Sequence, residues 1–148
     1  MRPFSTEFQV FFSYGRPDMR AVHNIHATLR SHGISGWMDV ENISAGEDWR
    51  SSIKSAMRGS QLVLVFLSRR VIAREGHLQE EIQYALEIQR RKPPGATFIV
   101  PVGLDDCPIH PWLERFHCIR LSTSDDLHRL IQQIQEVRRG RWATGVVS

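Results

Sequence analysis

Two adjacent glutamates, Glu80 and Glu81, begin a segment with helical periodicity in the stretch "GHLQEEIQYAL". Successive helical positions point about 100° apart, so neighbouring carboxylates cannot share the same surroundings. With Glu81 as the reference, the apolar positions fall on its side of the helix: Leu78, Ile82, Ala85 and Ile88. Glu80 falls beside Glu87, toward water. We therefore expect Glu81 to line a cleft at the margin of the core, where its ionisation is tuned.

The helix that carries these glutamates alternates with strands along the chain. Runs rich in β-branched and aromatic residues predict strands at residues 7–14, 34–38, 61–68, 96–104 and 117–122. Apolar residues at helical spacing predict helices at residues 19–32, from 49 onward, at about 78–91, and after a cap at Ser124 or Asp125. This alternation predicts an α/β fold, a parallel sheet with helices on both faces. The apolar third strand is expected at the centre and the short fifth strand at an edge.

Three stretches lie where such a sheet binds ligands, beyond the carboxyl ends of its strands. They are "SYGRPD" after the first strand, the polar loop of residues 39–48, and the connection from Ser68 to Glu81. Gly46 allows a tight return within the loop. We expect the Glu81 carboxylate to meet these stretches at one end of the sheet.

Length and composition restrict the class of protein. The 148 residues suit one domain, and a content of 41% hydrophobic and 24% charged residues is typical of soluble globular proteins. The longest apolar run, residues 62–67, is too short to span a bilayer, and no signal segment opens the chain. The expected location is the cytoplasm, without membrane binding.

The pI of about 9.3 is mostly a property of the C-terminal end. Of the 19 basic residues, Arg138, Arg139 and Arg141 lie in residues 138–148, which hold no acid, so 16 basic residues face 16 acidic ones elsewhere. A face that binds nucleic acid would leave the rest of the chain positive, so we expect no nucleic-acid partner. Residues 139–148 are expected to form a basic, flexible tail or linker.

The cysteines and histidines do not predict a metal site. Cys107 and Cys118 have no CxxC or HxxxH partner, so buried thiols are expected rather than zinc ligands or a disulfide framework. His23 and His26 have helical spacing but lack a nearby set of carboxylates. We therefore expect no metal.

The chain resembles a Toll/interleukin-1 receptor (TIR) domain in four successive stretches: "FFSYGRP", "LRSHGISGWMDVENISAG", "LVLVFLS" and "EIQYAL". The resemblance covers about residues 7–138 and implies a TIR domain at 6–138 with a flavodoxin-like, five-stranded parallel sheet. The stretch "MDVENISAG" is particularly similar to a loop of the axon-degeneration NAD hydrolase of animals and of bacterial TIR enzymes.

TIR domains divide into adaptors that signal by self-association and enzymes that cleave the N-glycosidic bond of NAD⁺. The enzymes release nicotinamide and leave ADP-ribose or a cyclised isomer. They carry a glutamate four residues before a small residue; Glu81 with Ala85 matches this pattern, whereas Glu80 is followed at that distance by Tyr84. The resemblance implies an NAD⁺ nucleosidase that has Glu81 as its catalytic residue, takes NAD⁺ as substrate and needs no cofactor.

One carboxylate suffices for this reaction. Hydrolysis of an ordinary glycoside uses two, because the alkoxide leaving group must be protonated. Nicotinamide leaves as a neutral molecule from a cationic ring, so an ionised carboxylate that stabilises an oxocarbenium-like charge is enough. The structural alternative is that Glu81 only favours the helix N-terminus.

The resemblance also implies substrate-binding residues near Glu81: Ser13, Tyr14, Arg16, Trp37, Asp39, Glu41, Gly46, Ser68 and His77. Arg16 matches a family arginine and is expected to meet the pyrophosphate, and the Tyr14 ring to border the nicotinamide. The alternatives are a surface arginine and strand-end packing of Ser13 and Tyr14. Trp37 or Trp49 is a candidate for stacking on a base, although Trp49 is expected in the core.

Two positions depart from the family pattern. His77 stands where many members have tryptophan, and Gly15 where close relatives often have arginine. Both changes bear on the nicotinamide side of the pocket, and neither removes the carboxylate.

By resemblance, activity depends on assembly into a homo-oligomer, in which residues 39–48 of one protomer complete the cleft of its neighbour. The family also implies a role in immune or antiphage defence. The position of the domain and its basic tail suggest an N-terminal effector domain with a C-terminal sensor domain beyond this chain; the alternative is a free-standing enzyme.

Two alternatives differ in function. A non-enzymatic TIR adaptor would act through homotypic TIR–TIR contacts and would be expected to lack the glutamate of the E-x-x-x-A pattern. A response-regulator-like receiver needs an acidic pair after the first strand and an aspartate after the third; Ser13, Tyr14 and Ser68 occupy those places, which excludes it.

Overall fold

The computed structural model describes residues 8–38, 45–46, 48–72 and 77–140 of the chain. At its centre is a parallel sheet in the order β2-β1-β3-β4-β5. Its strands are β1 (Gln9–Ser13), β2 (Ser35–Trp37), β3 (Leu62–Leu67), β4 (Ile99–Gly103) and β5 (Ile119–Arg120). The predicted flavodoxin-like sheet is confirmed, with β3 in the middle and β5 at an edge, although β5 is shorter than predicted. The candidate residues Asp39 and Glu41 and the tail beyond residue 140 lie outside the described residues.

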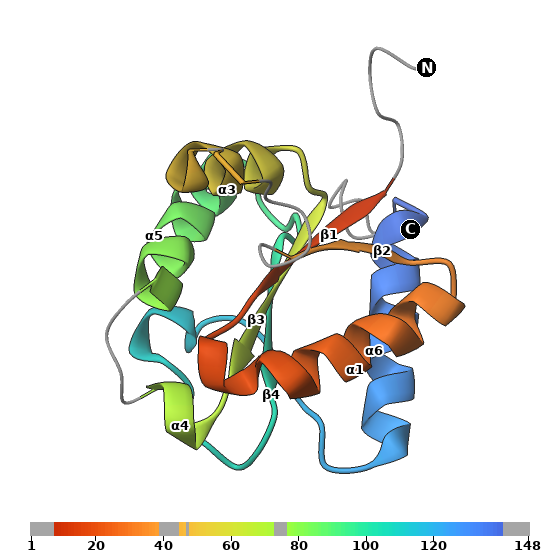
Figure 1. Ribbon diagram of the computed structural model, residues 1–148. Coiled ribbons are helices and arrows are strands. Elements are labelled where there is room, and N and C mark those ends of the chain that lie inside the picture. The colour runs from red at the N-terminus through yellow and green to blue at the C-terminus, as the bar shows by residue number, and fades with distance from the viewer. Residues whose placement is uncertain (1–7, 39–44, 47, 73–76, 141–148) are drawn as a thin grey trace.

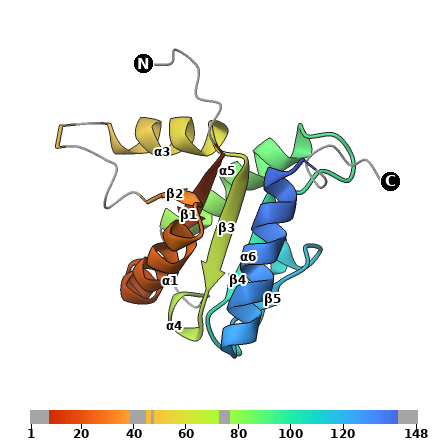
Figure 2. The ribbon, with the colours of Figure 1, turned by 90° about the vertical axis from the view of Figure 1, so that its right-hand side faces the viewer.

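Helices cover both faces of the sheet, as predicted (Figure 1). The helices α1 (Met19–Ser31) and α6 (Ser124–Arg138) lie over one face, in front of the strands in Figure 2. The helices α3 (Trp49–Arg58) and α5 (His77–Arg90) lie over the other. Within the described ranges there are also three short helical turns: η1 (Arg16–Asp18), α4 (Arg69–Ile72) and η2 (Pro111–Leu113).

The side chains of β3 alternate between two hydrophobic cores, one on each face of the sheet. Leu62, Leu64 and Phe66 pack toward α1 and α6, whereas Val63, Val65 and Leu67 pack toward α3 and α5. Every residue of the strand is buried. A strand covered on both faces has no polar side, which is why its sequence is a continuous apolar run.

The start of α6 differs from the prediction. Its N-cap is Thr123 rather than Ser124 or Asp125. The Asp126 carboxylate accepts a hydrogen bond from the backbone N–H of Thr123 at 2.9 Å and completes a capping box. A hydrogen bond from Arg129, together with the one from the Thr123 N–H, lowers the pKa of Asp126. The prediction was wrong because all residues of "STSDD" are acceptable caps, and only the pairing in space selects one.

Gly15 brings η1 close to α4 at the carboxyl end of β1. A Cβ atom on Gly15 would lie 2.6 Å from Cγ1 and 2.7 Å from Cγ2 of Val71. Val71 is itself 4% exposed, so it has little room to move away. This close approach explains why the arginine expected from the resemblance does not fit at this position.

The substitution Gly15→Ala should lower the free energy of unfolding by about 1–3 kcal/mol, because the added methyl group over-packs the contact with Val71. In a Val71→Ala background the same substitution should cost less. Urea unfolding of the four proteins measures both costs. Gly59→Ala is the control, because a Cβ there would lie 3.5 Å from its nearest neighbour. Equal costs in the two backgrounds would show that Val71 is not the obstacle.

His110 connects the loop between β4 and β5 to the first turn of α5. Its Nδ1 accepts a hydrogen bond from the backbone N–H of Trp112 at 3.1 Å, so the neutral ring carries its proton on Nε2. Nε2 lies 3.1 Å from Oε1 of Gln79 and donates to it. The imidazole is 9% exposed, and its burial lowers the pKa of His110. The loop is therefore held to α5 by a ring that must stay neutral.

Acidification should weaken this attachment. Because the pKa of His110 is lower in the folded state, the unfolded chain binds a proton first, and stability falls as the pH drops below about 6.5. His110→Asn keeps a cap for the Trp112 N–H and removes the titration. Urea unfolding at about pH 7.5 and pH 5.5 should show a smaller loss for His110→Asn than for the wild type. Parallel pH dependences would rule out this role of His110.

Candidate functional site

Glu81 is a buried carboxylate at the carboxyl end of the sheet. It lies in the second turn of α5 and is 7% exposed. The hydroxyl of Ser13, the last residue of β1, donates a hydrogen bond to Oε1 of Glu81 at 2.6 Å. Because α5 runs back along the parallel strands, its first turns lie beside their carboxyl ends. The orientation of Glu81 agrees with the helical spacing in the sequence.

Glu80 has a different environment, as the spacing also indicates. Its side chain is 53% exposed and forms an ion pair with Arg50 of α3 at 3.1 Å. An ion pair this exposed contributes little to stability. The two adjacent glutamates thus divide into a surface residue that reaches α3 and a buried residue that reaches β1.

A cavity of about 260 Å³ lies between α3 and α5 and includes Glu81 in its wall. Its apolar and aromatic lining comes from Trp49, Ile53 and Tyr84, and Arg50, Lys54, Glu80, Gln83 and Glu87 supply polar groups. Nζ of Lys54 lies 5.5 Å from the centre of the Tyr84 ring, within cation–π range. Glu81 therefore combines a buried carboxylate with access to a concave surface.

Trp49 and His77 form an aromatic pair at the start of the two helices. Their ring centres are 4.2 Å apart and the rings are tilted by 58°. Trp49 packs on the core as predicted, but it is only half-buried and also lines the cavity. The sequence named Trp49 as a candidate for stacking on a base but favoured the core, and it did not predict the contact with His77. The feature that could have indicated this contact is the position of Trp49 at the start of its helix.

Ser68 and Asp18 form a second buried pair. The Ser68 hydroxyl donates to Oδ2 of Asp18 at 2.6 Å, and Ser68 does not line the cavity at Glu81. Asp18 is 1% exposed and lies 3.6 Å from the guanidinium of Arg70. In the sequence, Asp18 is only one residue of the stretch "SYGRPD" after the first strand. Its burial depends on the approach of η1 to α4, which no local pattern indicates.

The other candidate residues are distributed around this end of the sheet. Tyr14 is half-buried and packs against the core on the α1 and α6 face, whereas Glu81 lies on the α3 and α5 side. Trp37 is half-buried and stacks on Phe11, with ring centres 5.0 Å apart. Arg16 is exposed at the first position of η1.

Gly46 is exposed with a φ of +88°, a conformation that favours glycine and suits the expected tight return.

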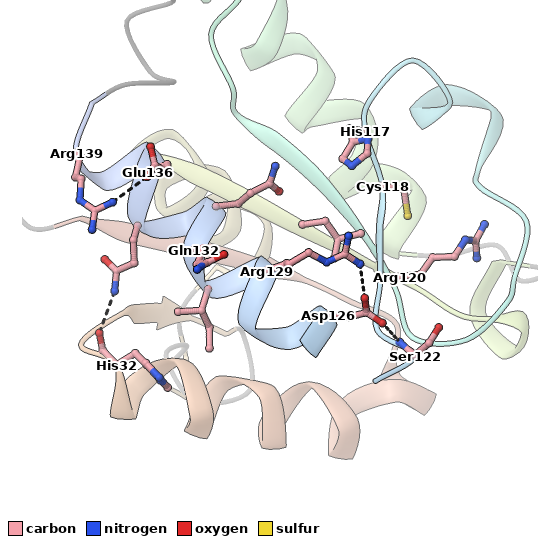
Figure 3. A pocket seen from close by; sticks show the side chains of 14 residues that line it. His32, His117, Cys118, Arg120, Ser122, Asp126, Arg129, Gln132, Glu136 and Arg139 are labelled. Carbon is pink, nitrogen blue, oxygen red and sulfur yellow. Dashed lines mark hydrogen bonds and ion pairs between the residues drawn. The ribbon is translucent and has the colours of Figure 1, made fainter. Parts of the chain in front are cut away.

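A larger hollow of about 1080 Å³ lies beside β5 and α6 and shares no residue with the cavity at Glu81 (Figure 3). Its cationic groups are engaged by neighbours. Arg129 pairs with Asp126, and Arg139 lies 2.9 Å from a carboxylate oxygen of Glu136. Arg120 donates to the carbonyl oxygen of Cys107 at 2.7 Å. This hollow has no group comparable to the buried carboxylate of Glu81.

Within the ranges that the structure describes, no group of three histidine, cysteine or acidic side chains is arranged to hold a metal ion. Cys107 is buried, as expected, and its burial raises the pKa of the thiol to about 11. Cys118 is partly buried, and its thiol pKa is also raised by burial. In the same ranges, no helix is both long and apolar enough to cross a membrane.

Comparison with solved structures identifies TIR domains of similar fold. The TIR domain of the Toll-related receptor TRR-2 from Hydra magnipapillata matches with a TM-score of 0.72 and 17% identity, over 87% of this chain and 99% of that one. The TIR domains of the activated Roq1 resistosome match with a TM-score of 0.68 and 21% identity, over 89% and 99%. A TIR-STING receptor from C. gigas matches with a TM-score of 0.68 and 20% identity, over 84% of this chain and 38% of that one.

Sequence comparison gives the family directly. No curated protein matches the chain. The family model described as "TIR domain" matches residues 10–134, which include most of β1, the residues that line the cavity at Glu81, and 11 of the 15 residues of α6. Since this match covers most of the chain and the fold agrees with it, the chain belongs to the TIR domain family.

Proposed function

We propose that this TIR domain cleaves the bond between nicotinamide and ribose in NAD⁺, with Glu81 as the essential carboxylate. The observation that carries the proposal is the position of Glu81, which is 7% exposed, fixed by Ser13 at 2.6 Å, and part of the wall of a cavity. A carboxylate in such surroundings is a candidate for chemistry rather than for solubility. The TIR family includes members that cleave NAD⁺, which adds support.

The chemistry follows from the nature of the leaving group. When the C–N bond breaks, its electron pair goes to the pyridinium nitrogen, and nicotinamide leaves uncharged. The positive charge moves to the ribose, where the ionised Glu81 stabilises it in surroundings of low dielectric. Water then bonds to the ribose carbon and loses a proton, which gives ADP-ribose; attack by an adenine nitrogen instead gives a cyclic isomer. The Ser13 hydroxyl holds one carboxylate oxygen in place throughout.

We further propose that the complete site forms only in a homo-oligomer. The cavity at Glu81 measures about 260 Å³, below the roughly 300–1,000 Å³ of pockets that enclose drug-sized ligands. It suits the nicotinamide end of NAD⁺ better than the whole dinucleotide. Residues 39–48 of a neighbouring protomer would supply the missing wall, including Asp39 and Glu41. The proposed setting is immune defence in the cytoplasm, through loss of NAD⁺ or a cyclic ADP-ribose signal.

Glu81→Gln should reduce NAD⁺ cleavage by about 100-fold or more, because it removes the charge that stabilises the transition state. Its amide oxygen can still accept the Ser13 hydrogen bond, so the protein should remain folded. Glu80→Gln is the matched comparison: it removes a carboxylate from the same cavity wall, but one that is 53% exposed and paired with Arg50, so its loss should be at least about tenfold smaller. Nicotinamide release at high protein concentration measures all three proteins.

Equal losses in the two variants would contradict the assignment of Glu81. An inactive wild type at every concentration, with self-association intact, would favour the non-enzymatic TIR adaptor instead.

Activity should depend on assembly and on residues supplied by a neighbour. The rate per protomer should rise with protein concentration or with a crowding agent, and sedimentation should show larger species over the same range. Glu81→Gln and Asp39→Ala should each be inactive alone. A mixture of the two should recover part of the activity, because one protomer then offers an intact carboxylate and the other an intact loop. A constant rate per protomer for a monomer, or no recovery on mixing, would contradict a shared site.

A further inference from the structure

Two buried serine–carboxylate pairs cross at the carboxyl ends of the neighbouring strands β1 and β3. Ser13 ends β1 and donates to Glu81 of α5, which follows β3 and α4 along the chain. Ser68 follows β3 and donates to Asp18 of η1, the turn that follows β1. Both bonds measure 2.6 Å and all four residues are buried. Each strand end is thus hydrogen-bonded to a segment that follows the other strand along the chain.

The Asp18 carboxylate stabilises the contact between η1 and α4. At 1% exposure it has almost no access to water, so its charge needs donors from the protein. The Ser68 hydroxyl is one donor, and the Arg70 guanidinium lies 3.6 Å from the other carboxylate oxygen. The close approach of Gly15 to Val71 joins the same two segments. Separating η1 from α4 would leave a buried charge without its partners.

We propose that Asp18 is a positioning residue for the site at Glu81, acting with Ser68 to hold the segment that carries Ser13 and Arg16. This inference rests on the proposed function, in which Glu81 is the reactive carboxylate. Only four residues separate Ser13 from Asp18, and Gly15 among them has no side chain to anchor the segment. The bond from Asp18 to Ser68 therefore adds to the pairing of Ser13 with Val65 of β3 in holding the strand end that presents the Ser13 hydroxyl to Glu81. Asp18 does not line the cavity and makes no contact with the substrate in this proposal.

The size of the effect follows from the geometry of catalysis. A displacement of about 1 Å at a reacting group can cost roughly 100-fold in rate. Loss of the Asp18 and Ser68 bond should therefore lower kcat by at least about tenfold. Because neither side chain binds the substrate, KM should change by less than about threefold.

The experiment compares Asp18→Asn, Ser68→Ala and their double variant with the wild type under assembling conditions. Because the two residues act through one bond, the double variant should lose no more kcat than the more damaged single variant. Asp106→Asn is the matched control: it removes an exposed carboxylate that pairs with Arg69, the neighbour of Arg70 on α4. It should leave kcat unchanged. Arg70→Gln, a surface change, replaces Asp18→Asn if that variant does not fold.

A second measurement is independent of activity. Ser13→Ala is made in the wild type and in Asp18→Asn, and the unfolding equilibrium constant of each protein is measured in urea. If Asp18 positions Ser13, the effect of Ser13→Ala should differ between the two backgrounds by a factor of about two or more. Identical effects would overturn the inference.

The two proposals fail in different ways. A wild type that does not cleave NAD⁺ defeats the proposed function, while the unfolding measurement still decides whether Asp18 and Ser13 are coupled. An active wild type with unchanged kcat in both Asp18→Asn and Ser68→Ala overturns the positioning role alone. A change in KM without a change in kcat also overturns it. So does a double variant in which the kcat losses of the two single variants add up.

Discussion

The structure depends on the need to satisfy buried carboxylates where the parallel strands end. A charged group removed from water is costly unless hydrogen-bond donors replace the water. Glu81 and Asp18 are both buried, and each accepts a hydrogen bond from a serine hydroxyl at 2.6 Å. These bonds restrict the rotation of α5 and the path of η1 more tightly than apolar packing would, because a hydrogen bond tolerates less displacement than a dispersion contact. The end of the sheet that faces the candidate site is thus held by polar contacts, and the centre by apolar ones.

Much of the fold follows from local sequence patterns. The apolar run of β3 is typical of a strand buried on both faces, and it predicted the central strand. The helical spacing in α5 is typical of a helix buried on one face, and it predicted that Glu81 points inward. The ends of elements were less predictable, because they depend on neighbours that are distant in sequence. β5 pairs only where β4 lies beside it, so it is two residues long, whereas the sequence predicted a strand over residues 117–122. The cap of α6 was likewise selected by pairing among several equivalent residues.

The residues of the candidate site could be predicted where their environment depends on nearby sequence, and not where it depends on distant segments. Glu81 could be distinguished from Glu80 because one helix contains all the information. Asp18 could not be found, since its burial arises where η1 meets α4. Trp49 shows the same limit: its helical face indicates packing against the core, but only the approach of α5 brings it against His77 and the cavity. The resemblance to TIR domains supplied the expectation that these loops meet, without the contacts that hold them.

The charge of the cavity at Glu81 bears on which part of a dinucleotide it would accept. Among the described residues that line it, three are carboxylates and two are cations. Arg50 is engaged by Glu80, and Lys54 lies over the Tyr84 ring. An anionic pyrophosphate would meet net negative charge there, whereas a pyridinium ring would meet a carboxylate and the aromatic faces of Trp49 and Tyr84. Under the proposed function, this charge distribution favours the nicotinamide end of NAD⁺ in the cavity over the phosphates. Under the same proposal, release of the product is easier than release of the substrate, because uncharged nicotinamide is no longer attracted by these carboxylates.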